Sequence, residues 1–308
     1  MKFTIYAIVV IGAAIIALLF LAGCTSLEKT AHTYVAAAQN APPAIVQENT
    51  AGTKVLADGW IETIPGKTGS IIKQEDIASL PEPVRRYFEW SLVVGKKRIS
   101  SFSVIIEGRI RNSADEEWMP LIMRQYNRID RIARIVYIES APKMMQGIDS
   151  YAEGTGRMHI KVANLITVAD SKGPEMDVSA LVTFMNDLVL CPVAYLSLPV
   201  RWKEIDGNRA EMEFTHNAHT IHAVLTFDDK GQLLNWQSDD RYAVVKGKNV
   251  QDHWSTPIEG TQELAGLRVP SSGKGIHDYN GTPFTYIELE RLHSLTLDAV
   301  ALPPRVQK

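Results

Sequence analysis

Four residues near the start of the chain have the most specific chemical pattern in the sequence. Leu21, Ala22 and Gly23 precede Cys24 and close an uncharged apolar run that begins at Thr4. A basic residue, an apolar segment and small residues before a cysteine form the layout of a lipoprotein signal peptide. We therefore predict cleavage before Cys24 and attachment of lipid, with palmitate among its acyl chains, to this cysteine.

An uncleaved signal anchor remains the alternative for the same segment. Residues 4–23 contain no charge, and about 20 apolar residues are enough to span a bilayer. Either interpretation predicts an exported, membrane-anchored protein in the cell envelope. Thr25 follows the cysteine where an aspartate would favour retention in an inner membrane. In a cell with two membranes we therefore expect the outer membrane, with the protein facing the periplasm.

Composition limits the partners and the redox chemistry. The chain has 32 Lys and Arg against 35 Asp and Glu, a net charge of −3. Removing residues 1–23 takes away Lys2 alone, which leaves 31 against 35, or −4. Nucleic acid is not predicted as a partner, because its binding needs a basic surface. The second cysteine, Cys191, lies among apolar residues, so we expect a buried, unreactive thiol.

Three polar residues could supply acid and base groups for catalysis. Glu175 and Asp187 flank or lie on a predicted helix, and His159 lies on a predicted strand. Paired carboxylates with a histidine can perform general acid and base catalysis. The structural alternative places Glu175 near the helix N-terminus and pairs Asp187 with Arg201 or Arg241, two of the arginines further along the chain.

No metal site and no cofactor are predicted. His216, His219 and His222 are close in sequence, and imidazoles can share a zinc ion. His219 and His222 are an odd number of residues apart on one predicted strand, so their side chains point to opposite faces of it. Sequence patterns of a serine nucleophile elbow, a phosphate loop and a zinc protease do not occur in the sequence.

Flexible apolar side chains indicate a groove for a lipid or another apolar ligand. Methionine adapts to varied apolar shapes, so it suits a site for acyl chains. The plainer interpretation is that the same residues fill the core. The candidates for the groove are Met123, Met144, Met145, Met158, Phe184 and Met185.

The elements that must position these residues follow from periodicity. Apolar residues at helical spacing predict helices over residues 26–39, 80–92 and 177–190. Alternating apolar and polar residues with turn residues between them predict strands. The predicted strands are residues 101–111, 118–128, 132–140, 154–163, 209–215, 219–227, 232–242, 255–264, 267–273 and 283–292. The predicted class is α+β, a large curved antiparallel sheet resembling a half-barrel and wrapped on the helix 177–190.

The domain organisation follows the same order. We predict a signal peptide or anchor over residues 1–23 and a tether with a short helix over 24–74. A single curved-sheet domain spans 75–295, and a tail spans 296–308.

Four motifs in order carry a family resemblance. They are LPEPVRRY at 80–87, ADSKGPE at 169–175, DRY at 240–242 and GLRVP at 266–270. The sequence from about residue 75 to 292 resembles the uncharacterised bacterial family called domain-of-unknown-function 6544. The resemblance implies an exported protein with a curved antiparallel sheet, similar in fold to the half-barrels of the lipoprotein-localisation proteins LolA and LolB. No activity is implied. The family has a glutamate followed by aromatic residues late in its central helix, where this chain has Asp187, Leu190 and Cys191.

These observations favour a lipid-anchored envelope protein that binds an apolar or amphiphilic ligand, a lipid or an acylated partner, between the sheet and the helix. The alternatives are a hydrolase or isomerase that uses Glu175, Asp187 and His159 in the same concavity, and a structural envelope protein without a ligand.

Overall fold

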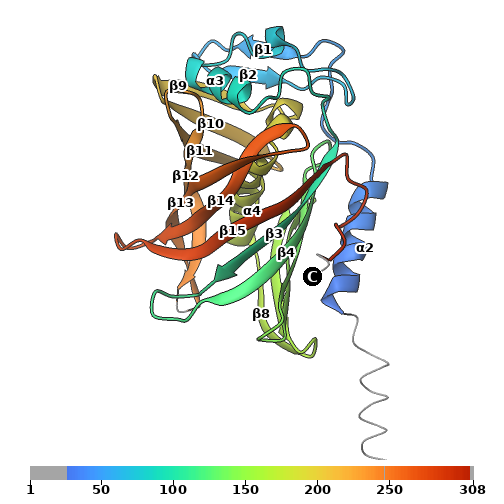
Figure 1. Ribbon diagram of the computed structural model, residues 1–308, viewed down its shortest axis with the longest axis vertical. Coiled ribbons are helices and arrows are strands. Elements are labelled where there is room, and N and C mark those ends of the chain that lie inside the picture. Colours follow the sequence, from blue (N-terminus) through green and yellow to red (C-terminus); the bar gives the residue numbers. More distant parts are fainter. Residues whose placement is uncertain (1–25, 246, 306–308) are drawn as a thin grey trace, which may run out of the picture.

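The computed structural model describes residues 26–245 and 247–305, and in this part of the chain one antiparallel sheet of fifteen strands is the main element (Figure 1). The strand order is β1-β2-β9-β10-β11-β12-β13-β14-β15-β3-β4-β5-β6-β7-β8. The first eight strands in sequence are β1 (Gly52–Val55), β2 (Ile61–Ile64), β3 (Ser101–Ile110), β4 (Met119–Arg128), β5 (Ala133–Ser140), β6 (Met145–Ala152), β7 (Thr155–Val162) and β8 (Ile166–Lys172). The other seven are β9 (Arg201–Asp206), β10 (Arg209–His216), β11 (His219–Phe227), β12 (Leu233–Val245), β13 (Lys248–Leu264), β14 (Leu267–Asp278) and β15 (Phe284–Leu297).

Helix α4 (Pro174–Asp187) shows how strongly this sheet curves. The helix contacts β11 and β12 on one side and β6, β7 and β8 on the other. Six strands separate β12 from β6 in the sheet, which would put these strands roughly 30 Å apart in a flat sheet. A helix about 10 Å wide can touch both only if the sheet curls around it. Register shifts in the pairings of β12 to β15 supply part of the bend.

A glycine on β7 lets α4 lie directly on the sheet. A Cβ on Gly156 would lie 2.4 Å from the carbonyl oxygen of Met176 and 2.7 Å from the Cβ of Ala180. The amide of Gly156 donates to the carboxylate of Asp177 over 2.7 Å. The helix begins at Pro174 with Gly173 as its N-cap, so Asp177 lies within the first turn. Asp177 ties the first turn to the strand.

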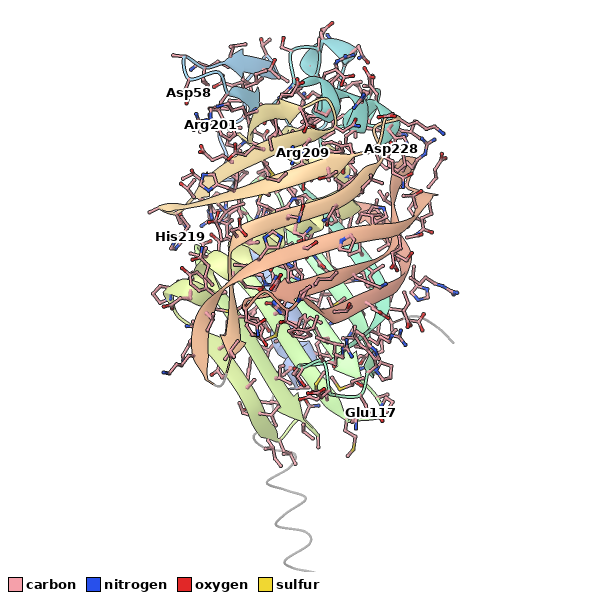
Figure 2. The ribbon with its side chains drawn as sticks, turned by 90° about the vertical axis from the view of Figure 1, so that its left-hand side faces the viewer. Asp58, Glu117, Arg201, Arg209, His219 and Asp228 are labelled. Carbon is pink, nitrogen blue, oxygen red and sulfur yellow. The ribbon has the colours of Figure 1, made fainter. Side chains whose placement is uncertain are left out.

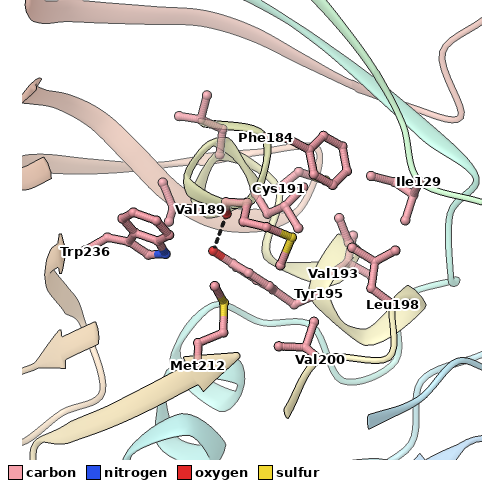
Figure 3. Close-up of a cluster of buried hydrophobic side chains, with 14 of the residues drawn as sticks. Ile129, Phe184, Val189, Cys191, Val193, Tyr195, Leu198, Val200, Met212 and Trp236 are labelled. Atoms are coloured by element: carbon pink, nitrogen blue, oxygen red, sulfur yellow. Dashed lines mark hydrogen bonds between the residues drawn. The ribbon is translucent and has the colours of Figure 1, made fainter. Parts of the chain in front are cut away.

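One end of the concave face is filled by side chains, and we call it the packed end (Figure 3). Two segments cover this end. One is residues 188–198, which include η2 (Leu188–Leu190) and η3 (Pro192–Ser197), and the other is helix α3 (Glu82–Trp90). Tyr195, Trp202 and Trp236 are fully buried there. The hydroxyl of Tyr195 donates to the carbonyl of Met185 over 2.8 Å. Cys191 is buried in the same cluster, and burial raises the pKa of its thiol well above the ordinary value.

Helix α2 (Leu27–Asn40) packs on the opposite, convex face. A second apolar cluster joins its Leu27, Ala31 and Val35 to Tyr126, Ile135, Tyr137 and Ile148 of β4, β5 and β6. Arg128 donates to the carbonyls of Gln39 (3.0 Å) and Ala41 (2.6 Å) at the C-terminus of the helix. A cation at this end also interacts favourably with the helix dipole. The predicted helix is therefore confirmed, and it is docked on the sheet.

Within the predicted tether over residues 24–74, the described residues 26–74 form regular structure. β1 and β2 form a hairpin, and β2 pairs with β9, so the hairpin extends the sheet beside the packed end. In Figure 2 Asp58 of this hairpin lies near Arg201 of β9, with which it forms an ion pair of 2.5 Å. Arg201 also pairs with Glu213. Each of these strands has only four residues, which is too short to show a clear alternation in the sequence.

The antiparallel α+β class and the predicted helices and strands are confirmed, with differences in some strands and helix ends. β1, β2, β6, β8 and β9 were not predicted, and the central helix spans Pro174–Asp187 instead of residues 177–190. The predicted cleavage and anchor segment, with Cys24, lies outside the described residues. Among residues 26–245 and 247–305, every helix is too short or too polar to cross a bilayer.

Candidate functional site

A cavity of about 140 Å³ lies between the C-terminal part of α4 and the concave face of the sheet, beyond the packed end. We call it the inner cavity. Its walls come from β3 to β7 on one side and from β12 to β15 on the other, with α4 and η2 between them. The sheet curvature therefore brings together residues more than 150 positions apart in the sequence, such as Ile106 and Ile287.

Most of the wall is apolar. The aliphatic and methionine side chains that line it are Ile106, Ile110, Leu121, Met123, Ile138, Met158, Val189, Leu190, Ile258, Ile287 and Leu289. Trp254 and Tyr286 add two aromatic surfaces. Gly275 leaves room for one of them, because a Cβ there would lie 2.5 Å from the Trp254 ring.

A charged cluster forms part of the same wall. The Nε of Arg134 on β5 donates to Asp187 of α4 over 2.6 Å, and its Nη1 donates to Asp149 of β6. Gln125 of β4 also donates to Asp187, over 2.8 Å. Burial alone would lower the pKa of Arg134, but the two carboxylates raise it above the ordinary value. This guanidinium is therefore fully charged and holds the helix end to two strands.

A second guanidinium, Arg241 of β12, has different surroundings. Its Cζ lies 4.1 Å from the ring centroid of Trp254, and its Nη1 donates to Thr183 of α4 over 2.7 Å. Its Nε is buried and has no hydrogen-bond partner. Among the described residues Arg241 forms no ion pair with a carboxylate. Desolvation lowers the pKa of this guanidinium, although it remains a cation at neutral pH.

Two further polar groups adjoin the cavity behind Trp254. His277 of β14 and Asp252 of β13 are buried and hydrogen-bonded to each other through the imidazole Nδ1. The ring of His277 lies 4.9 Å from that of Trp254 and 4.7 Å from that of Tyr286, centroid to centroid. Desolvation lowers the pKa of His277, and Asp252 offsets this only in part. Desolvation also raises the pKa of Tyr286.

The proposed acid and base residues do not lie together. Asp187 lines the inner cavity, and its partner is Arg134 rather than the expected Arg201 or Arg241. Glu175 lies in the first turn of α4, at the opposite end of the helix. His159 is on β7, where it contacts Thr167 of the edge strand β8. The strand and helix directions separate the three, so the catalytic set expected from the sequence is not assembled.

The candidates for the apolar groove divide into two groups. Met123 and Met158 line the inner cavity. Phe184 and Met185 are fully buried on the faces of α4 that meet the core, and they do not line it. Met144 is 65% exposed in the turn before β6, and Met145 packs partly against the core. These four placements correct the prediction, because helical rotation and the strand turn direct the side chains away from the concavity.

Two of the three neighbouring histidines, His216 and His222, have different partners. The Nδ1 of His216 lies 2.8 Å from the hydroxyl of Tyr151, where the β10–β11 turn meets β6 across the concave face. His222 contacts Asp240, at 3.1 Å, and Glu213. Within the part of the chain that the structure describes, no three His, Cys, Asp or Glu side chains are grouped as metal ligands.

Sequence reasoning missed most polar residues of the cavity. Arg134 has the same strand parity as the buried Val136 and Ile138, and Gln125 has the same parity as Met123. A charged or amide side chain on the apolar face of a strand was therefore a usable signal. Asp149 lies on β6, which was not predicted as a strand, so it offered no such signal.

Comparisons with known proteins agree with the predicted family. The model of the family of unknown function DUF6544 matches residues 70–289. A crystal structure of a DUF1329 family protein from Desulfovibrio piger is similar at 11% sequence identity and a TM-score of 0.34, over 71% of this chain and 94% of that chain. A comparison with curated proteins finds no match. Since the family model covers most of the chain, from the helix before β3 to β15, the protein belongs to the DUF6544 family.

Proposed function

We propose that this protein binds an apolar or amphiphilic ligand, a lipid or an acyl group, in the inner cavity. The observation that carries the proposal is the cavity itself, which the sheet and α4 leave open beside a fully packed core. Its wall combines many aliphatic side chains with a few charged groups, as is typical of small-molecule sites.

The shape of the wall favours a chain-like ligand. Met123 and Met158 come from different strands and give the wall two adaptable side chains. The residues of β3 and β15 that line the cavity are mostly aliphatic, and most of its charged groups lie on α4, β5, β6 and β12, with Lys274 on β14. A ligand with an apolar tail and a polar head can contact both the aliphatic and the charged parts of the wall.

Fluorescence quenching tests the proposal, because Trp254 lines the cavity and Trp236 lies in the packed end. We expect 9,10-dibromostearate to quench part of the tryptophan emission of the full-length protein saturably. The quenched part should disappear in Trp254→Phe and persist in Trp236→Phe. Quenching that is equal in both variants, or that does not saturate, would contradict binding in the cavity.

We also propose that the protein is an exported lipoprotein, anchored to an envelope membrane through lipid on Cys24. The support is the Leu-Ala-Gly-Cys sequence after the apolar run. Metabolic labelling with an alkyne analogue of palmitate should mark the wild-type chain and leave Cys24→Ser unlabelled. Labelling of both chains, or of neither, would contradict lipidation at this cysteine.

A further inference from the structure

The charged groups of the inner cavity are paired unevenly. Three cations, Arg134, Arg241 and Lys274, line the cavity with two carboxylates, Asp149 and Asp187. Lys274 is paired at 2.5 Å with Glu259, which lies outside the lining. Both carboxylates contact Arg134. Arg241 contacts neither, and its one hydrogen bond goes to the uncharged hydroxyl of Thr183.

Arg241 is half-buried at the cavity wall, and it differs in this respect from the fully buried arginines elsewhere in the described residues. Each of those has a carboxylate partner. The pairs are Arg98 with Asp76, Arg124 with Glu28, Arg128 with Asp130, and Arg134 with Asp149 and Asp187. A desolvated cation without an anion is costly, because burial removes its water and nothing charged replaces it.

The neighbours of Arg241 hold its side chain in place. Trp254 stacks on one face of the guanidinium, and the indole N–H of Trp254 donates to Asn186 over 3.1 Å. Thr256 donates to the same Asn186 oxygen over 2.8 Å. The nearby Asp252 accepts from His277 and from the backbone amide of Asp278. The stack and the Thr183 contact fix the guanidinium while leaving donors free at the cavity wall.

We infer that Arg241 is the binding site for the anionic head group of the ligand, a carboxylate or a phosphate attached to an apolar chain. This inference rests on the proposed function and adds the charge class of the ligand. The guanidinium offers paired N–H donors whose geometry matches the oxygens of either group. The apolar tail then lies along the aliphatic wall of β3, β4 and β15.

Displacement of a neutral fluorescent probe, N-phenyl-1-naphthylamine, from the full-length protein at pH 8 tests the inference. Dodecanoate and dodecanol have the same chain length and differ in charge. We expect dodecanoate to displace the probe at a concentration at least roughly ten-fold lower than that of dodecanol. A hydrogen bond to a charged group gives about this difference in affinity. Lauroyl lysophosphatidate and monolauroylglycerol make the same comparison for a phosphate. The pair in which the anionic ligand is favoured more strongly over the neutral one identifies the head group.

Three variants assign the effect to Arg241. In Arg241→Met the preference for the anion should be lost, with dodecanol binding unchanged, and Arg241→Lys should keep part of it. Arg157→Met is the control, because Arg157 is a partly exposed cation paired with Asp170 outside the cavity. Probe binding in each variant shows that the cavity is intact.

The outcomes separate the two proposals. Failure of the wild-type protein to bind the probe or any of the four ligands would contradict the proposed function. Binding of all ligands without preference for the anionic ones would overturn the inference alone. The inference would also be overturned if Arg241→Met weakened dodecanoate and dodecanol equally.

Discussion

The two ends of the concave face differ in whether their arginines are paired with carboxylates. At the packed end Arg98 is 1% exposed, and its guanidinium contacts the carboxylate of Asp76 at 2.9 Å and the carbonyl of Leu196. At the inner cavity Arg241 has an aromatic ring and one hydroxyl. The Nε of each arginine is buried without a hydrogen-bond partner, so the difference is the carboxylate that Arg98 contacts and Arg241 lacks.

The same contrast holds for the aromatic residues. Tyr195 and Trp202 pack edge to face at 5.6 Å in an apolar cluster, where both side chains are fully buried. Trp254 has a guanidinium on its ring, a histidine at its edge and the inner cavity beside it. Residues 188–198 fill the first end and reach the second only with Val189 and Leu190. The filled end stabilises the fold, and the open end is available for function.

Truncation of large side chains should show the largest difference between the two ends. We expect Trp202→Ala to lower the free energy of unfolding by about 3–5 kcal/mol, because the fully buried ring leaves a large cavity. Ile287→Ala removes atoms that already border open space and should cost less, about 1–2 kcal/mol. Thermal and denaturant unfolding of the full-length protein measure both. Equal costs would contradict the division into a packed and an open end.

Loss of the charged cluster around Arg134 should have the second-largest effect on the free energy of unfolding. Arg134→Met leaves Asp149 and Asp187 without their cation and should cost about 3 kcal/mol. The control Arg109→Met removes a partner of Glu288 from a position that is 41% exposed, and should cost less than about 1 kcal/mol. Denaturant unfolding compares the two. A similar small loss in both would show that the cluster does not hold α4 to the sheet.

The contact between α4 and β7 gives a smaller effect. Gly156→Ala places a Cβ against the backbone of Met176 and should destabilise the protein by about 1–3 kcal/mol. Gly207→Ala is the matched control, because a Cβ there meets nothing within 4 Å. Its stability should change by less than about 1 kcal/mol. A neutral Gly156→Ala variant would mean that α4 can shift without cost.

The pH dependence of stability should be the smallest effect. The pKa of His277 is lowered on folding, mainly by desolvation. The unfolded chain therefore binds a proton near its ordinary pKa, about 6.5, while the folded chain does not. Stability is full above about pH 6.5 and falls as the pH drops below it. His277→Asn should flatten the decline in melting temperature between pH 7.5 and 5.5.

A comparison with His216 sharpens this last prediction. Desolvation also lowers the pKa of His216, which lies at the contact with Tyr151 away from the inner cavity. A variant in which both histidines are replaced by Asn should flatten the decline further than His277→Asn alone. An unchanged slope in the double variant would show that other groups set the pH dependence.

Local patterns alone determined the elements and the family of this protein. The two-residue turns at Asn217-Ala218 and Ala265-Gly266 have positive φ and join strands at the predicted places. The alternation in β11 and the apolar spacing in α4 also survive in the structure. These features depend on neighbours within a few residues, so the sequence displays them directly.

The tertiary structure alone decided which residues form the inner cavity. Arg241 meets Trp254 and Thr183, and Arg134 meets Asp187, only because bulged strands curl the sheet around α4. The same curl separates His159 and Glu175 from Asp187 and directs Met144 to solvent. Periodicity shows which face of its own element a side chain occupies. It does not show which side chains from distant strands meet, since that depends on the curvature and packing of the whole sheet.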